Sequence, residues 1–203
     1  MFLINGSFFV IAGVIVYLLI RGLMIKPSKQ KAMNWFNEMT RFLFVLYCLL
    51  VVSVTLFPLP IGFPYSFENL SAFINLIPFV SIWKQISLIG IAYDGDVLFM
   101  IELITRNVGG NILLFVPLGF LIPIIWKNVR HFKQIFLIGI GVSVTIELLQ
   151  LLESFVGGLG RVTDIDDVIC NGFGAVLGYL LFDLLLLFSK KYQLRILHRI
   201  YKV

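Results

Sequence analysis

The segment from Glu147 to Gly178 constrains this chain most, because it sets a group of charged side chains directly beside an apolar run. That run, from Gly172 to Phe188, has Asp183 as its only charged residue. A charged side chain costs roughly 2.5–3.5 kcal/mol at the centre of a bilayer and less toward the surface. The polar middle of the segment therefore predicts groups that pair with one another or with a ligand: Arg161, Asp164, Asp166, Asp167 and Asn171.

The composition predicts an all-α, polytopic membrane helix bundle. Of the 203 residues, 60% are hydrophobic and 13% are charged, and the mean hydropathy is +1.00. A membrane-spanning helix needs about 20 largely apolar residues. We expect one transmembrane domain over residues 1–203, with five spans at about residues 2–20, 42–57, 111–126, 135–153 and 165–188.

The positions of the basic residues predict the orientation of the bundle. The net charge is +5, but the Lys and Arg residues flank apolar runs instead of forming a soluble basic face, which argues against nucleic-acid binding. An N-outside, C-inside arrangement leaves all but three of the sixteen Lys and Arg on the cytoplasmic side, as the positive-inside rule requires. The three are Lys84, Arg106 and Arg161.

The long outer loop between the second and third spans, from Pro58 to about Arg106, is unusually apolar. Residues 75–83 and 97–105 are too hydrophobic for a free loop and too short to span. We expect them to form re-entrant or interfacial helices.

Polar residues recur at helical spacing in the last three spans. In the fourth, Ser143, Glu147 and Gln150 share one face, and in the fifth Asp164, Asp167 and Asn171 do. That second face continues through the small residues Ala175 and Gly178, which allow close helix packing. Asn107 and Asn111 are one turn apart at the start of the third. Asp166 lies about 200° from Asp164 at 100° per residue, and is assigned to the surface or to another partner.

The predicted depths of these residues agree. At 1.5 Å per residue, Glu147 lies ~18 Å from the cytoplasmic side, and Asn171 lies ~10 Å below Asp164 from the outside. Both positions fall in the outer half of the bilayer, as does Asn111. We therefore predict one polar site open to the outside, with Arg161 as a counter-ion of Glu147 or as a bidentate donor to a phosphate or carboxylate.

Several chemistries suit this set of residues. Glu147, Asp164 and Asp167, with Asn171, can hold a divalent cation through oxygen atoms, act as general acid and base, or bind a polar headgroup without reaction. A bland alternative is that the residues only cap helices and join them by hydrogen bonds. Serine–histidine catalysis is disfavoured because His131 and His198 lie on the predicted cytoplasmic side, and Cys48 and Cys170 lie at different predicted depths, which disfavours a disulfide.

Four segments carry a resemblance to a known family. They occur in order as Asn75-Leu76-Ile77-Pro78-Phe79, Asn111-Ile112-Leu113-Leu114-Phe115-Val116-Pro117-Leu118-Gly119-Phe120, Glu147-Leu148-Leu149-Gln150, and Arg161 to Gly174. Together they resemble the VanZ-like membrane proteins over about half of the chain. The sequence departs from the family pattern at Cys170 and Phe173, where small or hydroxyl residues are expected.

The resemblance implies a multi-pass protein of the bacterial cytoplasmic membrane that is associated with reduced susceptibility to teicoplanin and related glycopeptides. The leading hypothesis is that it binds an anionic lipid, a lipid-linked wall precursor or a lipoglycopeptide. The alternatives are a hydrolase or transferase that acts on a lipid headgroup and a non-catalytic interaction protein, and the sequence favours binding over catalysis. Neither an oligomeric state nor a firm cofactor follows from the sequence.

The expected roles divide between ligand contact and catalysis. Glu147, Asp164 and Asp167 are the candidate catalytic residues and metal ligands. The full set of predicted ligand-binding residues comprises Asn75, Asn107, Asn111, Glu147, Gln150, Arg161, Asp164, Asp167 and Asn171.

Overall fold

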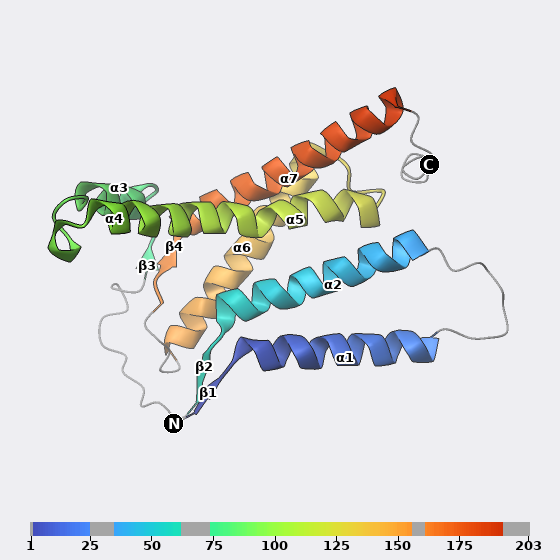
Figure 1. Ribbon diagram of the computed structural model, residues 1–203, viewed down its shortest axis with the longest axis horizontal. Coiled ribbons are helices and arrows are strands. Elements are labelled where there is room, and N and C mark those ends of the chain that lie inside the picture. Colours follow the sequence, from blue (N-terminus) through green and yellow to red (C-terminus); the bar gives the residue numbers. More distant parts are fainter. Residues whose placement is uncertain (1, 25–34, 62–73, 156–160, 193–203) are drawn as a thin grey trace. The chain divides into compact units, whose positions relative to one another are not determined.

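The computed structural model describes residues 2–24, 35–61, 74–155 and 161–192 (Figure 1). Five helical stretches among these residues are long and apolar enough to cross a membrane, which confirms the predicted all-α, five-span class. The N-outside, C-inside orientation stays a prediction. The basic linker after the first span and the basic tail, including His198, lie outside the described residues. The chain forms two compact units.

The first unit combines Met1–Glu68 with Leu152–Arg161. Helix α1 (Gly6–Met24) packs against helix α2 (Trp35–Leu56), and strand β1 (Phe2–Ile4) pairs antiparallel with strand β2 (Leu59–Ile61). The Asn5 side chain accepts a hydrogen bond from the Ser7 amide at 3.1 Å, which suits the start of a helix. Helix α1 therefore begins at Gly6, later than the apolar run predicts.

Helix α2 starts earlier than expected because its polar first turns are held by ion pairs. Glu38 pairs with Arg21 of α1 and, at 3.3 Å, with Arg41 of its own helix. The second span thus begins at Trp35, before the predicted residue 42.

The second unit combines Asn69–Leu151 with Val162–Val203. Its elements are strand β3 (Ile74–Asn75), helix α3 (Val80–Ser87), a 3-10 turn (Tyr93–Gly95), helix α4 (Val97–Ile104), a π-turn (Thr105–Gly109), helix α5 (Gly110–Ile125), the greater part of helix α6 (Phe132–Phe155), strand β4 (Thr163–Asp164) and helix α7 (Ile165–Lys191). Strands β3 and β4 are parallel, with Ile74 opposite Thr163 and Asn75 opposite Asp164.

The third span begins at Val97, well before the predicted residue 111. Asp96 caps α4 by accepting the Phe99 amide at 3.0 Å. The π-turn at Thr105–Gly109 carries α4 directly into α5, giving 29 helical residues (Figure 1). Residues 97–105 are therefore the beginning of a span and not a separate re-entrant piece. Helix α3 is a short helix in the loop, as expected there, and its interfacial location stays a prediction.

Helices α5 and α7 pack at backbone contact. A Cβ added to Gly119 would overlap the Ala175 carbonyl, and one added to Gly174 or Gly178 would overlap the carbonyls of Ile112 and Val116. The prediction that Ala175 and Gly178 form a close helix-packing face is confirmed. This packing places the first turns of α7, which carry the aspartates, next to α5.

Candidate functional site

The charged residues of the candidate site fall into two groups, one in each unit. The carboxylate cluster comprises Glu147, Asp164, Asp166 and Asp167 in the second unit. The arginine cluster comprises Arg161, Glu153, Ser154 and the main-chain carbonyls of Thr55 and Phe57 in the first unit.

Glu147 anchors the carboxylate cluster to strand β4. It is only 5% exposed, and its Oε2 atom accepts the Asp164 amide at 2.9 Å. Its main-chain carbonyl accepts the Thr163 hydroxyl at 3.2 Å. A hydrogen bond from a backbone N–H to a carboxylate is a strong one. The Glu147 carboxylate therefore fixes the position where β4 ends and α7 begins.

Asp164 links β4 to β3 and caps α7. Its Oδ1 atom accepts the Asp166 amide at 2.9 Å, the bond expected of an N-cap residue, and the Asn75 side chain at 3.0 Å. Asn75 also donates to the Ser81 hydroxyl at 2.8 Å. The parallel pairing of β3 with β4 explains how Asn75 reaches a residue far away in the sequence.

Asp166 is the residue that sequence reasoning left out of the site. It is 2% exposed, and its two carboxylate oxygens accept the amides of Phe79 and Ile82 (3.2 Å for Ile82) at the start of α3. Phe79 has a left-handed conformation (φ 65°) and no side-chain cap of its own. Asp166 supplies both the acceptor and the negative charge that the N-terminus of a helix favours. The surface location considered for it is wrong, and the alternative of a different partner is confirmed.

Asp167 and Asn171 extend the cluster along α7. Asn111 of α5 forms a side-chain hydrogen bond with Asp167. One turn further on, Asn171 donates to the Ser143 hydroxyl at 2.8 Å, and both residues are buried. The Oδ1 atom of Asn171 has no hydrogen-bond partner among the described residues.

Electrostatic interactions connect the four carboxylates, since Glu147 interacts with Asp164 and Asp167, and Asp167 with Asp164 and Asp166. In the described ranges, none of the four forms an ion pair with a Lys, Arg or His side chain. Nor do His, Cys, Asp and Glu side chains there form a group of three or more that could hold a metal ion. The cluster thus concentrates negative charge without a basic partner in the described chain.

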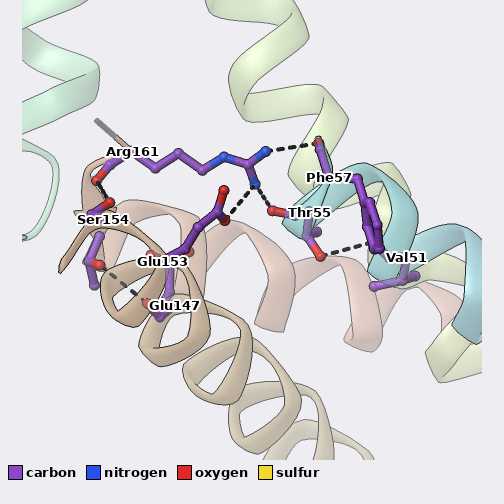
Figure 2. Close-up of polar contacts among 8 residues, drawn as sticks. Val51, Thr55, Phe57, Glu147, Glu153, Ser154 and Arg161 are labelled. Atoms are coloured by element: carbon purple, nitrogen blue, oxygen red, sulfur yellow. Dashed lines mark hydrogen bonds and ion pairs between the residues drawn. The ribbon is translucent and has the colours of Figure 1, made fainter. Parts of the chain in front are cut away.

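The arginine cluster is organised differently (Figure 2). The Arg161 guanidinium donates to the carbonyl of Thr55 and, at 2.9 Å, to that of Phe57, where α2 ends. It also lies 3.9 Å from Glu153, whose side chain is 7% exposed. The Ser154 hydroxyl donates to the Arg161 carbonyl at 2.9 Å. A cation beside the last carbonyls of a helix satisfies acceptors that the helix leaves open and complements its dipole.

The remaining predicted residues are placed as follows. Asn107 donates to Gln85 of α3 at 3.2 Å and is exposed, and Gln150 is half-buried on α6. Glu153, which pairs with Arg161, was not among the predicted site residues. A signal existed, since Glu153 is the other carboxylate of the fourth span. Both cysteines are free thiols.

Comparison with known proteins supports the family resemblance that the four sequence segments carry. The profile of the VanZ/LLP1 family matches residues 44–187, a range that contains both clusters. The chain belongs to the VanZ/LLP1 family. Protein VanZ of Enterococcus faecium is 28% identical over 146 residues, covering 72% of this chain and 74% of that protein. No solved structure matches the chain. Membership of this family and five apolar helices identify a multi-pass membrane protein.

Proposed function

We propose that this VanZ/LLP1 family member resides in the bacterial cytoplasmic membrane and lowers susceptibility to teicoplanin-type glycopeptides by binding an envelope amphiphile. The ligand would be a lipid, a lipid-linked wall precursor or a lipoglycopeptide whose polar head lies at the carboxylate cluster. The resistance association rests on the family and on similarity to Protein VanZ.

One observation carries the binding part of the proposal. Four acidic side chains are held at fixed positions by backbone and amide donors, and no basic side chain of the described chain neutralises them. Charged groups inside a membrane protein are expensive and are usually paired or functional. Packing alone explains Asp166, which uses both oxygens on α3. It does not explain Glu147 or Asp167. Among the described residues, the Glu147 carboxylate accepts one hydrogen bond, from the Asp164 amide, and the Asp167 carboxylate accepts one, from the Asn111 side chain.

The roles within the site follow from these contacts. Glu147, Asp164 and Asp167 would contact the ligand, while Asn75 and Asn111 hold two of these carboxylates in place. Arg161 is fully accounted for by the end of α2 and by Glu153, so we assign it to the structure of the first unit and not to the ligand. A divalent cation bound by the same carboxylates is the competing occupant.

The enzymatic alternative would need a free general base. Asp164 already caps α7 and accepts from Asn75, and Glu147 and Asp167 each already accept a hydrogen bond, so the described residues offer no carboxylate that is free of hydrogen bonds. These features favour binding over turnover.

The test is teicoplanin susceptibility in a bacterium that lacks its own copy of this gene. We expect the wild-type protein to raise the inhibitory concentration, and Glu147→Gln and Asp167→Asn to lose that protection at unchanged membrane abundance. Glu102→Gln, which alters an exposed acid of α4, is the matched control and should protect like the wild type. Loss of protection only where abundance falls would support the packing alternative.

A further inference from the structure

We propose that the ligand at the carboxylate cluster presents a primary ammonium group to Glu147, Asp164 and Asp167. This inference rests on the proposed function and adds the chemical class of the group that is recognised. A cluster of carboxylates without a basic partner has to bind a cation or protons to be stable inside a membrane protein.

The hydrogen bonds already formed at the cluster leave few donors for a ligand that only accepts. Asn75 uses both amide hydrogens, on Ser81 and Asp164. Asn111 is engaged with Asp167, and the Asp164 and Asp166 amides are engaged with Glu147 and Asp164. The capacity that remains consists largely of carboxylate oxygens, so the ligand has to bring the donors.

A second observation points the same way and does not depend on the carboxylates. Asn171 is 3% exposed, and its Oδ1 acceptor has no partner within the described part of the chain. Its amide nitrogen bonds Ser143, one turn from Glu147 on α6, and Asn171 itself is one turn from Asp167 on α7. Asn171 and Ser143 therefore each lie one helical turn from a carboxylate of the cluster, on the same two helices that carry Asp167 and Glu147. A buried acceptor left unsatisfied costs about 1–3 kcal/mol, which a donor from the ligand would recover.

An ammonium group suits this arrangement better than the other cations. It carries three N–H donors and can share them among several oxygen acceptors in short, charge-assisted hydrogen bonds. A divalent metal needs oxygen ligands within about 2.0–2.6 Å of one point, and the described His, Cys, Asp and Glu side chains form no group of three or more that could hold one. An ammonium group makes longer bonds, of about 2.7–2.9 Å, and can direct each N–H to a different acceptor. A quaternary amine has the charge but no N–H to donate.

The experiment measures thermal unfolding of the full-length protein in detergent micelles doped with one lipid at a time. The probe is a phosphatidylethanolamine, compared with its N-acetyl derivative and with phosphatidylcholine carrying the same acyl chains. We expect phosphatidylethanolamine alone to raise the midpoint, by about 5 °C at saturation for a chain of this size. The rise should disappear in Glu147→Gln and Asp167→Asn and persist in Glu102→Gln.

Two further arms separate the sources of the cation. Soluble ethanolamine tests whether the amine suffices without acyl chains, and magnesium chloride tests an inorganic cation. A rise with ethanolamine supports the ammonium site but removes the requirement for a lipid. A rise with magnesium alone, an equal rise with phosphatidylcholine, or no difference between the ethanolamine lipid and its N-acetyl form would overturn the inference.

Failure of this inference can be distinguished from failure of the proposed function. If Glu147→Gln loses teicoplanin protection while the amine has no effect on unfolding, the site is functional but recognises another chemistry. If Glu147→Gln protects fully, the proposed function itself is wrong, whatever the lipid experiment shows.

Discussion

The two polar clusters place charge in a membrane protein by opposite means. In the arginine cluster, one cation donates to two carbonyls at the end of a helix and lies 3.9 Å from one carboxylate, so that each charge has an opposite charge of the chain beside it (Figure 2). The oxygens of that carboxylate, Glu153, are buried and have no hydrogen-bond partner among the described residues. In the carboxylate cluster, four acids are oriented by amide and backbone donors, and no described cation compensates them.

This difference separates structural from ligand-binding polar groups. A charge that the chain itself neutralises is explained by folding. A charge that the chain orients but leaves uncompensated is explained by something that binds. By this criterion we assign Arg161 to the fold, and we assign Asp166 to the fold because both of its oxygens accept amides of α3. Glu147, Asp164 and Asp167 remain as the proposed ligand-binding acids. Three substitutions test the division and a fourth tests the packing of α5 against α7, in descending order of their expected effect on stability.

Arg161→Met should lower the free energy of unfolding most, by about 3–4 kcal/mol. It leaves the buried Glu153 carboxylate without a cation and two carbonyls at the end of α2 without donors. Adding Glu153→Gln should recover much of this loss. Denaturant unfolding in detergent measures both variants. If the Arg161→Met protein were as stable as the wild type and had lost only ligand binding, Arg161 would be a ligand-binding residue and its assignment to the fold would be wrong.

Asp166→Ala should cost about 3 kcal/mol, since it removes a buried carboxylate that accepts two amides of α3. Hydrogen exchange should then speed up in α3 (Val80–Ser87) in particular. Asp183→Ala, at an exposed position further along α7, is the control and should leave that exchange unchanged. Wild-type exchange in the Asp166 variant would contradict the role given to it.

Gly174→Ala should cost about 2 kcal/mol, because the new Cβ would overlap the Ile112 carbonyl and force α5 and α7 apart. Gly141→Ala offers the comparison, since a Cβ there meets nothing within 4 Å and alanine favours a helix. The midpoint of thermal unfolding should fall for the first substitution and stay level or rise for the second. Equal midpoints would mean that the close contact between α5 and α7 is not required.

Glu147→Gln should change stability least, by less than about 1 kcal/mol, because the glutamine carbonyl can still accept the Asp164 amide. Protection against teicoplanin should nevertheless be lost. If its unfolding free energy instead fell as far as that of Asp166→Ala, Glu147 would belong with the structural acids.

The fold class followed from apolar run length, which is a local property, whereas span boundaries depended on features that run length does not report. Helix α4 continues into α5 because a π-turn absorbs the sequence around Gly109, and α2 gains its first turns from ion pairs formed by Glu38. Both features are side-chain or backbone geometry that hydropathy does not contain.

Helical spacing predicted which polar residues share one face of a helix, but it did not predict the groups on other elements to which they bond. Spacing compares residues on one helix, so it placed Asp166 off the shared face and did not anticipate that α3 would present two amides to it. Arg161 finds its acceptors among main-chain carbonyls near residue 56, and backbone acceptors carry no signal in a sequence. The β3–β4 pairing that brings Asn75 to Asp164 is likewise a long-range contact.

The most direct test of the central claim is native mass spectrometry of gently purified protein, wild type beside a Glu147→Gln/Asp167→Asn double variant. We expect the wild type to retain an amine-bearing lipid, and the double variant to lose it while keeping the same unfolding midpoint. Identical adducts on both proteins, or a bound lipid without an amine, would contradict the assignment of the carboxylate cluster as an ammonium-binding site.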